Sequence, residues 1–243
     1  MNFLRITMAI PAIALVAACS VDATDDGGDG ETSDVAVSGL QVPPDECPND
    51  VSKFRLPSDQ EKANAVANHD TVDPTDIVPK DLLADALGFF DVNSDQLQNT
   101  DYVTVVDFSR PSSKKRFFII DMNSGAVEAH QVAHGTGSDP NDTGMAKIFG
   151  NKENSNMSSL GFFRTMDIYD GKHPHSLQIE GLSATDDQVC QRHVIVHEAA
   201  YVHDDGAKTG RSNGCFALSQ AVARRITDEL KHGSLIYAGR SGQ

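Results

Sequence analysis

The residues best suited to chemistry lie between His197 and Cys215, in a stretch that reads HEAAYVHDDGAKTGRSNGC. It follows three β-branched residues at 194–196 and ends in Gly214-Cys215, after a loop rich in glycine, aspartate and serine. Cysteine attacks an acyl carbon as the thiolate, and a nearby imidazole promotes that form by accepting the proton. The two side chains need to meet in space, not in sequence. This pattern favours nucleophilic catalysis by Cys215 with His197 as base, whereas a small buried cysteine is the commoner alternative.

The residues just before Cys215 suit the other parts of such a reaction. The backbone N–H of Cys215, together with that of Gly214, is a candidate donor to a tetrahedral oxyanion, and glycine permits the close approach that this needs. Arg211 carries a two-pronged guanidinium that suits a substrate carboxylate, although a solvated loop charge is an equally good interpretation.

Several short motifs between about residues 75 and 240 carry a family resemblance. In chain order they are Val106-Asp107-Phe108, His134-Gly135, Ser158-Ser159-Leu160-Gly161, Tyr169-Asp170-Gly171-Lys172-His173, Ser176-Leu177 with Gly181-Leu182, and Gly210 to Cys215. Together with His197 they resemble YkuD-type L,D-transpeptidases, and more specifically the murein L,D-transpeptidase catalytic domain family.

The resemblance implies a fold, a reaction and a set of site residues. The implied fold is mainly β with a few helices, an L,D-transpeptidase-like β-sandwich. The implied reaction cleaves the bond before the terminal D-alanine of a peptidoglycan tetrapeptide stem through a Cys215 thioester, passes the acyl group to an amine or to water, and uses no cofactor. Ser212 and Asn213, or a carbonyl of their loop, are the implied partners that orient His197. Besides Arg211, the expected substrate-binding residues are His134, Ser159, Gly161 and His173.

Two positions depart from the commoner family pattern. That pattern has histidine between the serine and the glycine, where this chain has Asn213, and often arginine or asparagine two positions after the cysteine, where this chain has Ala217. Arg211 is a candidate to replace the missing arginine. These departures concern the preference for donor and acceptor more than the thiol chemistry.

The element pattern predicts helices first and short strands afterwards. Ser58 to Glu61 fits a capping box, and Pro79 begins a helix with an apolar stripe. That stripe consists of Leu82, Leu83, Ala86, Leu87 and Phe90. A later helix has Ser219 as N-cap, Val222, Ile226 and Leu230 on one face, and Gly233 as terminator.

Short β-like runs occupy most of the chain after Asp101. They are expected at 102–108, 116–121, 126–134, 161–169, 176–182, 193–197, 216–218 and 234–238. The turn at 123–125 predicts a hairpin between the second and third runs. Many short strands with turn signals are typical of a sandwich or a barrel.

The N-terminus has the features of a targeting segment. A single arginine, Arg5, precedes an apolar run at 8–18, which is followed by Cys19. A positive start, a short apolar run and small residues before the cut are typical of a secretory signal, and the run is too short to span a bilayer. The cysteine resembles the acceptor of a bacterial lipoprotein, and Ser20 after it favours the periplasmic face of the outer membrane. The alternative is an ordinary signal peptide with a chance cysteine.

These features divide the chain into four expected parts. Residues 1–18 are the signal peptide and 19–50 a lipidated acidic tether, because 20–50 hold nine acids and no lysine or arginine and have little to bury. Residues 51–100 are a helical extension packed on the domain, and 101–243 are the catalytic domain. We expect an exported, lipid-anchored monomer.

The four cysteines also divide by expected role. If Cys19 is lipidated and Cys215 is the nucleophile, Cys47 and Cys190 are left. An oxidising compartment permits a disulfide between these two, which would join the end of the tether to the domain. Two unpaired thiols are the alternative.

The sequence argues against a metal site and a nucleic-acid partner, and it leaves two alternatives to a thiol enzyme. His193 and His197 have a spacing seen in zinc sites, but along a strand four residues separate the rings by about 13 Å, so we expect no metal. The net charge of −15 and the lack of a basic stripe with interleaved aromatics exclude nucleic acid as an expected partner. The main alternative is a non-catalytic peptidoglycan-binding lipoprotein, and a zinc peptidase is the weaker one.

Overall fold

The computed structural model describes residue 47 and residues 50–242. The expected signal peptide, the lipidation at Cys19 and most of the expected tether lie outside these residues. Within the described part, no helix is long and apolar enough to cross a membrane. The helices are α1 (Asp59–Asn68), α2 (Lys80–Val92) and α3 (Gln220–Leu230), with short 3-10 turns at Val51–Lys53, Ser94–Gln96 and Thr136–Ser138. The strands are β1 (Tyr102–Asp107), β2 (Phe117–Asp121), β3 (Val127–His130), β4 (Gly161–Tyr169), β5 (Ser176–Gly181), β6 (Ile195–Glu198), β7 (Phe216–Leu218) and β8 (Leu235–Gly239).

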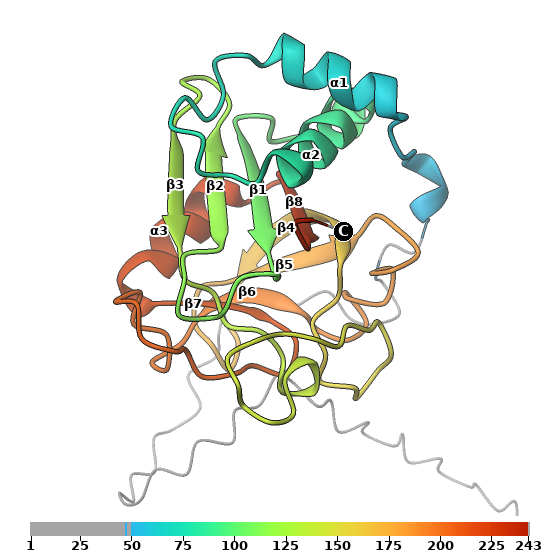
Figure 1. Cartoon of the computed structure of the whole chain (residues 1–243). Coiled ribbons are helices and arrows are strands. Elements are labelled where there is room, and N and C mark those ends of the chain that lie inside the picture. The colour runs from blue at the N-terminus through green and yellow to red at the C-terminus, as the bar shows by residue number, and fades with distance from the viewer. Residues whose placement is uncertain (1–46, 48–49, 243) are drawn as a thin grey trace, which may run out of the picture.

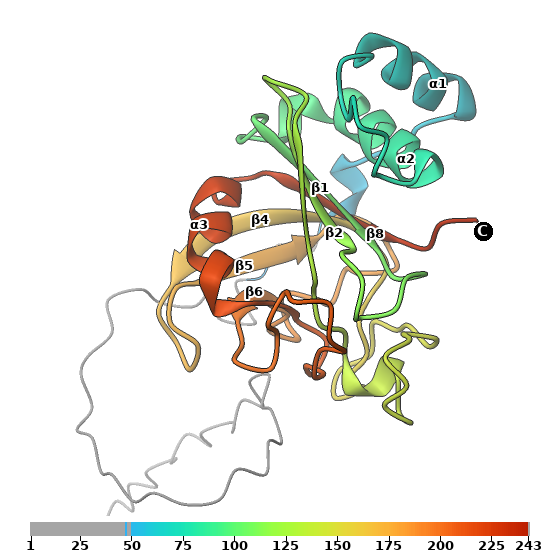
Figure 2. The same cartoon turned by 60° about the vertical axis from the view of Figure 1, so that its left-hand side comes forward.

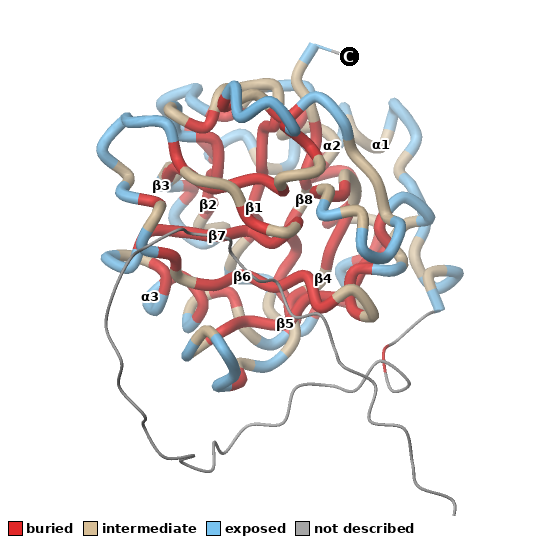
Figure 3. Tube along the Cα trace, turned by 90° about the horizontal axis from the view of Figure 1, so that it is seen from below, coloured by how far each residue is buried: buried red, intermediate tan, exposed pale blue. Residues whose placement is uncertain are grey.

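The strands form one sheet that is nearly closed. Their order is β3-β2-β1-β8-β4-β5-β6-β7, and the pairs β1–β8 and β6–β7 are parallel. The segment after β3 then reaches the other end of the sheet, where the N–H of Ala133 donates to the carbonyl of Ala217 at 2.9 Å and Gly135 bridges to Ser212. Figure 3 shows the strands around a buried interior. The mainly β fold class with a few helices is confirmed.

Alternation along the strands creates two cores. In β2, Phe117 and Ile119 belong to one apolar cluster while Phe118 and Ile120 belong to the other, as expected for side chains that alternate between the faces of a sheet. Phe162 and Phe163 of β4, and Leu235 and Ile236 of β8, divide in the same way. The first cluster includes residues of α3, and the second includes residues of α2. Helices therefore cover the sheet on both faces.

The helices begin where the sequence places them. Ser58 accepts a hydrogen bond from the backbone of Glu61, whose side chain returns one to the backbone of Ser58, which completes the predicted capping box of α1. Pro79 precedes α2, and Phe89 of α2 stacks on Phe162 with ring centroids 3.9 Å apart. Figure 1 shows α1 and α2 at one end of the molecule and the loops at 131–160 and 199–214 toward the other, and Figure 2 gives the same arrangement from a second side.

Two predicted strands have a boundary that differs by two or more residues from the expected one. The run at 126–134 ends as β3 at His130, because Gln131 uses its N–H and its side chain to bind Asp204 and the carbonyl of Ala207. The run at 193–197 begins as β6 only at Ile195, since His193 adopts a left-handed φ of 53° and closes a turn onto Cys190. Both chain segments thereby become loops beside the candidate site.

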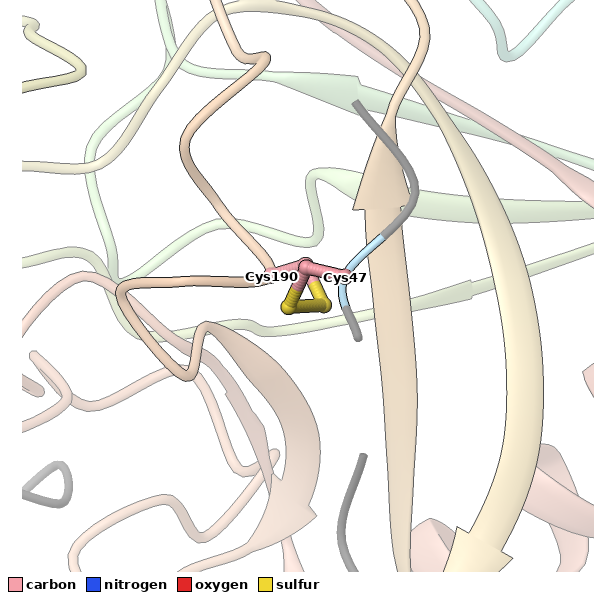
Figure 4. Close-up of a disulfide and its surroundings, with 2 residues drawn as sticks. All are labelled: Cys47 and Cys190. Atoms are coloured by element: carbon pink, nitrogen blue, oxygen red, sulfur yellow. A yellow bond between two sulfur atoms is a disulfide. The ribbon is translucent and has the colours of Figure 1, made fainter. Parts of the chain in front are cut away.

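A disulfide joins Cys47 to Cys190, with their Cα atoms 5.7 Å apart. Figure 4 shows that it ties the segment before the first helices to the loop between β5 and β6. The sequence predicted this pair. The bond anchors the chain two residues before Arg192.

Candidate active site

His197 and Cys215 come from neighbouring parallel strands. His197 of β6 is in register with Ala217 of β7, and Cys215 lies two positions before Ala217. Since side chains two apart on a strand share a face, His197 and Cys215 point to the same side of the sheet. Cys215 also packs against Ile195, which lies two residues before His197 on that face. The structure therefore brings the two predicted catalytic side chains together.

The tautomer of His197 suits a general base. Nδ1 lies 2.7 Å from the carbonyl oxygen of Glu198, which only accepts hydrogen bonds, so Nδ1 carries the proton. Nε2 is then the basic nitrogen, and it is buried without a hydrogen-bond partner in the part of the chain that the structure describes. Burial, together with the nearby His173, lowers the pKa of His197 to about 4. The ring is therefore neutral near pH 7 with Nε2 unprotonated, and a pKa this low makes it a weaker base than a free imidazole.

Two aromatic side chains, those of His173 and Tyr169, lie beside His197 and Cys215. The ring of His173 stacks on that of His197 with centroids 4.1 Å apart and an interplanar angle of 25°. Tyr169, at the end of β4, packs against Cys215. His173, one of the expected substrate-binding residues, lies against His197, and Tyr169 belongs to the same sequence motif as His173.

Cys215 is fully buried, with Sγ 3.7 Å from the carbonyl oxygen of His193. It takes part in a disulfide in this structure, so the chemistry considered below is that of its reduced thiol. The left-handed backbone at His193 turns its carbonyl toward the sulfur. The buried sulfur and the neutral imidazole of His197 lie on the same side of the sheet, and the reduced thiol would act as a nucleophile only after deprotonation.

The loop before Cys215 is organised by Ser212. Its hydroxyl donates to the carbonyl of Cys215 at 2.7 Å and accepts from the N–H of Gly214 at 3.1 Å. Ser212 therefore shapes the loop at 211–214, which is called the nucleophile loop below after the predicted role of Cys215. The carbonyl of Glu198, and not the expected Ser212 or Asn213, orients His197. Because the Gly214 N–H is used inside the loop, the N–H of Cys215 is the stronger oxyanion candidate of the two.

Three of the predicted substrate-binding residues, His134, Ser159 and Gly161, are engaged in contacts within the protein. His134 is fully buried; Arg116 donates to its Nδ1 at 2.8 Å, so Nε2 keeps the proton and donates to Asp139 at 3.4 Å. Burial and the charge of Arg116 lower the pKa of His134 to about 4. A substrate cannot reach a ring that is buried and bonded on both sides, so this position does not fit the predicted contact.

Ser159 is buried and Gly161 is partly buried, and both contact other segments of the protein. The Ser159 hydroxyl donates to the carbonyl of Gly150 and accepts from Arg192 at 2.7 Å. A Cβ at Gly161 would lie 2.5 Å from both Asp186 Oδ2 and Ser183 Oγ, so this glycine permits the close approach of another loop. Ser159 is thus used in hydrogen bonds within the protein and Gly161 in the packing of a neighbouring loop, and their part in substrate binding stays a prediction.

Arg211 is paired within the protein. Its guanidinium donates to the carbonyl of Asp139, and its Nε lies 3.4 Å from the carboxylate of Asp142. These contacts tie the nucleophile loop to the loop at 139–144. Its predicted role as the binder of a substrate carboxylate stays a prediction.

Arg192 and the carbonyl of Glu198 belong to the site but escaped the sequence analysis. Arg192 contacts Met157, Ser159 and Gly150 and lies beside Gly214. Its position five residues before His197 was the available signal, but nothing in the spacing separates it from a surface charge. Among the described residues, no group of three or more histidine, cysteine or acidic side chains has a geometry that could hold a metal ion.

Replacing Gly214 by alanine is expected to destabilise the protein and disable the site. Gly214 has φ 116°, and an added Cβ would lie 2.7 Å from the carbonyl oxygen of Met157. We expect a loss of about 1–3 kcal/mol in the free energy of unfolding and roughly 100-fold in turnover, because a shift of about 1 Å misplaces Cys215.

Gly206 offers a matched control in the same loop. It has φ 88°, but nothing lies within 4 Å of its Cβ position, so Gly206→Ala carries the backbone strain without the clash. Urea unfolding and turnover are measured for both variants. Equal effects at the two positions would contradict the assigned packing at Gly214.

The two buried neutral histidines predict loss of stability in acid. His134 and His197 have folded pKa values of about 4, below the ordinary histidine value of 6.5. The unfolded chain therefore binds these protons first, so the contribution of these two rings to the free energy of unfolding is constant above about pH 6.5 and falls as the pH drops toward 4. We expect a loss of about 2–3 kcal/mol per histidine.

This pH dependence is best measured by urea unfolding between pH 7 and 4 in a Cys215→Ala protein, where no thiol is coupled to the ring. His197→Gln in that background is expected to remove about half of the loss. Asp139, whose pKa is about 2 because bonds from Thr143 and Gly144 outweigh its burial, titrates below this window. Unchanged stability between pH 6.5 and 4 would contradict the assignment of neutral rings.

Comparisons with known proteins identify the family of this chain. Residues 75–238 match the family described as L,D-transpeptidase catalytic domain (YkuD_2). A comparison with curated proteins finds no match.

Solved structures with a similar fold include three bacterial proteins. An L,D-transpeptidase from Mycobacterium smegmatis is 15% identical, with a TM-score of 0.36, covering 57% of this chain and 58% of that one. The helical cell shape determining protein Pgp2 (K307A mutant) from Campylobacter jejuni is 8% identical, with a TM-score of 0.38 and 60% and 49% coverage. An L,D-transpeptidase from Xylanimonas cellulosilytica is 14% identical, with a TM-score of 0.33 and 58% and 62% coverage. The matches thus span less than two thirds of each solved chain.

Proposed function

The chain belongs to the L,D-transpeptidase catalytic domain family, and from this premise we propose that it is a peptidoglycan L,D-transpeptidase that works through a thioester on Cys215. The observation that carries the proposal is the pairing of His197 and Cys215 on one face of two adjacent strands, with the Nδ1 proton of His197 held by the carbonyl of Glu198. A binding module has no need of this arrangement.

In the first half of the reaction, His197 Nε2 takes the proton of the Cys215 thiol. The sulfur attacks the carbonyl carbon of the third stem residue, and the N–H of Cys215 stabilises the oxyanion. Collapse of the tetrahedral intermediate breaks the C–N bond to the terminal D-alanine, whose amine receives the proton from His197. A thioester and free D-alanine result.

In the second half, a nucleophile attacks the thioester. An amine of another stem gives a crosslink, and water gives a tripeptide, as in an L,D-carboxypeptidase. His197 takes the proton of the incoming nucleophile and returns it to the departing sulfur. The balance between the two products depends on how well the site excludes water.

We propose further that the protein is exported and held by a lipid on Cys19, at the periplasmic face of the outer membrane. The pattern of residues 1–20 supports the anchor. The disulfide between Cys47 and Cys190 fits an oxidising compartment. Labelling with a radioactive fatty acid is expected to mark the native chain and not a Cys19→Ser chain, and labelling of both would contradict the proposed acceptor.

The catalytic proposal is tested by incubating the protein, with Cys215 reduced, with a disaccharide tetrapeptide and following mass. Loss of D-alanine with a transient adduct on Cys215, absent in Cys215→Ser, is the expected result. Dimers or tripeptides then separate transfer from hydrolysis. Substrate binding without adduct or turnover would overturn the proposal in favour of a wall-binding lipoprotein.

A further inference from the structure

Arg192 brings a partly buried positive charge to the loop that precedes Cys215. Its Nη1 donates to the carbonyl of Gly150 at 3.1 Å and to the hydroxyl of Ser159 at 2.7 Å. Its Nη2 donates to the carbonyl of Met157 at 2.6 Å. These three acceptors hold the guanidinium in one orientation, and all three are electrically neutral.

No carboxylate balances this charge among the described residues. The ion pairs found there, within 4.0 Å, include Arg110 with Asp107, Arg164 with Glu180 and Arg211 with Asp142, but none involves Arg192. Burial lowers the pKa of Arg192, and no acidic neighbour acts in the opposite direction. A buried charge without a counter-charge is costly, and it is commonly balanced by a ligand of opposite sign.

The guanidinium lies against the residue that precedes Cys215. A Cβ on Gly214 would be 3.1 Å from Arg192 Nη2, which puts that nitrogen within about 5 Å of the Gly214 Cα. The next residue along the chain, His193, has its carbonyl oxygen 3.7 Å from the Cys215 sulfur. Arg192 and its neighbour thus contact the nucleophile loop with both side chain and backbone.

The loop that carries Arg192 is also anchored. Cys190, two residues earlier, is bonded to Cys47 (Figure 4), and the N–H of Arg192 donates to the carbonyl of Gln188 at 2.9 Å. An anchored guanidinium loses little conformational entropy when it binds a planar anion.

We propose that Arg192 binds the C-terminal carboxylate of the stem peptide, the carboxylate of the residue that leaves. The inference rests on the proposed function, which places the scissile carbon on the sulfur of Cys215. The carbon of that carboxylate is three covalent bonds from the scissile carbon, and its oxygens lie about 4–5 Å from the scissile carbon, which matches a cation beside Gly214. Arg211 is less suited, because Asp142 already pairs with it. A second carboxylate source, the side chain of a diamino-acid residue in the stem, is separated by the test.

The test measures binding by calorimetry to the full chain carrying Cys215→Ala. Three synthetic tetrapeptides are compared: one with a free C-terminus, one with a C-terminal carboxamide, and one with an amidated side-chain carboxylate. Each is measured with Arg192, Arg192→Gln and Arg192→Lys. Arg55→Gln is the matched control, since Arg55 is exposed, lies near α1 and pairs with Glu61.

With Arg192 present, the C-terminal carboxamide is expected to bind about 10- to 100-fold more weakly than the free acid. In Arg192→Gln that difference is expected to vanish, in Arg192→Lys to shrink, and in Arg55→Gln to persist. If Arg192 has a purely structural role, Arg192→Gln weakens the binding of all three peptides equally, and the difference between the free acid and the carboxamide remains. That result would overturn the inference. A penalty confined to the amidated side chain also overturns it.

The two proposals can fail separately. If all peptides bind with equal affinity when Arg192 is present, the role of Arg192 is wrong while the proposed function stands. If no peptide binds, the proposed function fails and the inference that rests on it fails too. If Arg192→Gln does not fold, as judged by its unfolding midpoint, the carboxamide penalty with Arg192 and its reduction in Arg192→Lys still decide the question.

Discussion

Replacing His197 by glutamine is expected to slow acylation of Cys215 by about 100- to 10,000-fold. Glutamine can occupy the space and accept a bond, but it cannot take up the thiol proton. In the proposed reaction, the neutral tautomer of His197, set by the carbonyl of Glu198, is the base that accepts this proton. The rate of adduct formation in single-turnover mass measurements checks the prediction.

The matched control for this variant is His232→Gln. His232 is exposed and pairs with Asp167 away from the site, so the same substitution there is expected to leave acylation unchanged. An acylation rate in His197→Gln within tenfold of the parent rate would contradict the assignment of the base. It would leave the thiol chemistry without a proton acceptor in the described structure.

Replacing Arg116 by methionine is expected to cost about 3–5 kcal/mol in the free energy of unfolding. Arg116 is fully buried and donates twice to the carbonyl of Val132, once to that of Arg110 and once to His134. Methionine is similar in length but leaves these acceptors unpaired, and each buried unpaired group is costly. For a chain of this size the midpoint of thermal unfolding is expected to fall by about 10 °C.

Thermal unfolding of Arg116→Met is compared with that of Arg55→Met. Arg55 is exposed and pairs with Glu61 alone, so its loss is expected to cost at most about 1 kcal/mol. We also expect Arg116→Met to lower turnover, because the carbonyl of His134 accepts from the N–H of Ser212, the residue that shapes the nucleophile loop. Equal midpoints for the two variants would contradict the role given to Arg116.

Local patterns were sufficient for most elements. The capping box at Ser58, the hairpin at 123–125 and the alternating strand at 117–121 depend on residues close together in the chain, so periodicity and turn chemistry predict them. The boundaries failed at His130 and His193, where contacts from distant loops end the strand.

The candidate site likewise combines features that local sequence predicts with features that depend on tertiary contacts. The sequence by itself determined which thiol and which imidazole are the candidates, because their types and their strand-and-loop setting are local properties. It also predicted the disulfide between Cys47 and Cys190 on the premise that Cys215 is a free thiol, whereas the structure has Cys215 in a disulfide as well.

Only the tertiary structure decided which polar residues the protein uses internally. Closure of the sheet encloses His134 with Arg116 and Asp139, and it encloses Ser159 with Arg192. Burial and hydrogen-bond partners arise from segments far apart in the chain, such as Met157 and Gly214 around Arg192. No spacing within a sequence encodes that meeting, and so the unbalanced guanidinium beside the nucleophile became visible only in the folded protein.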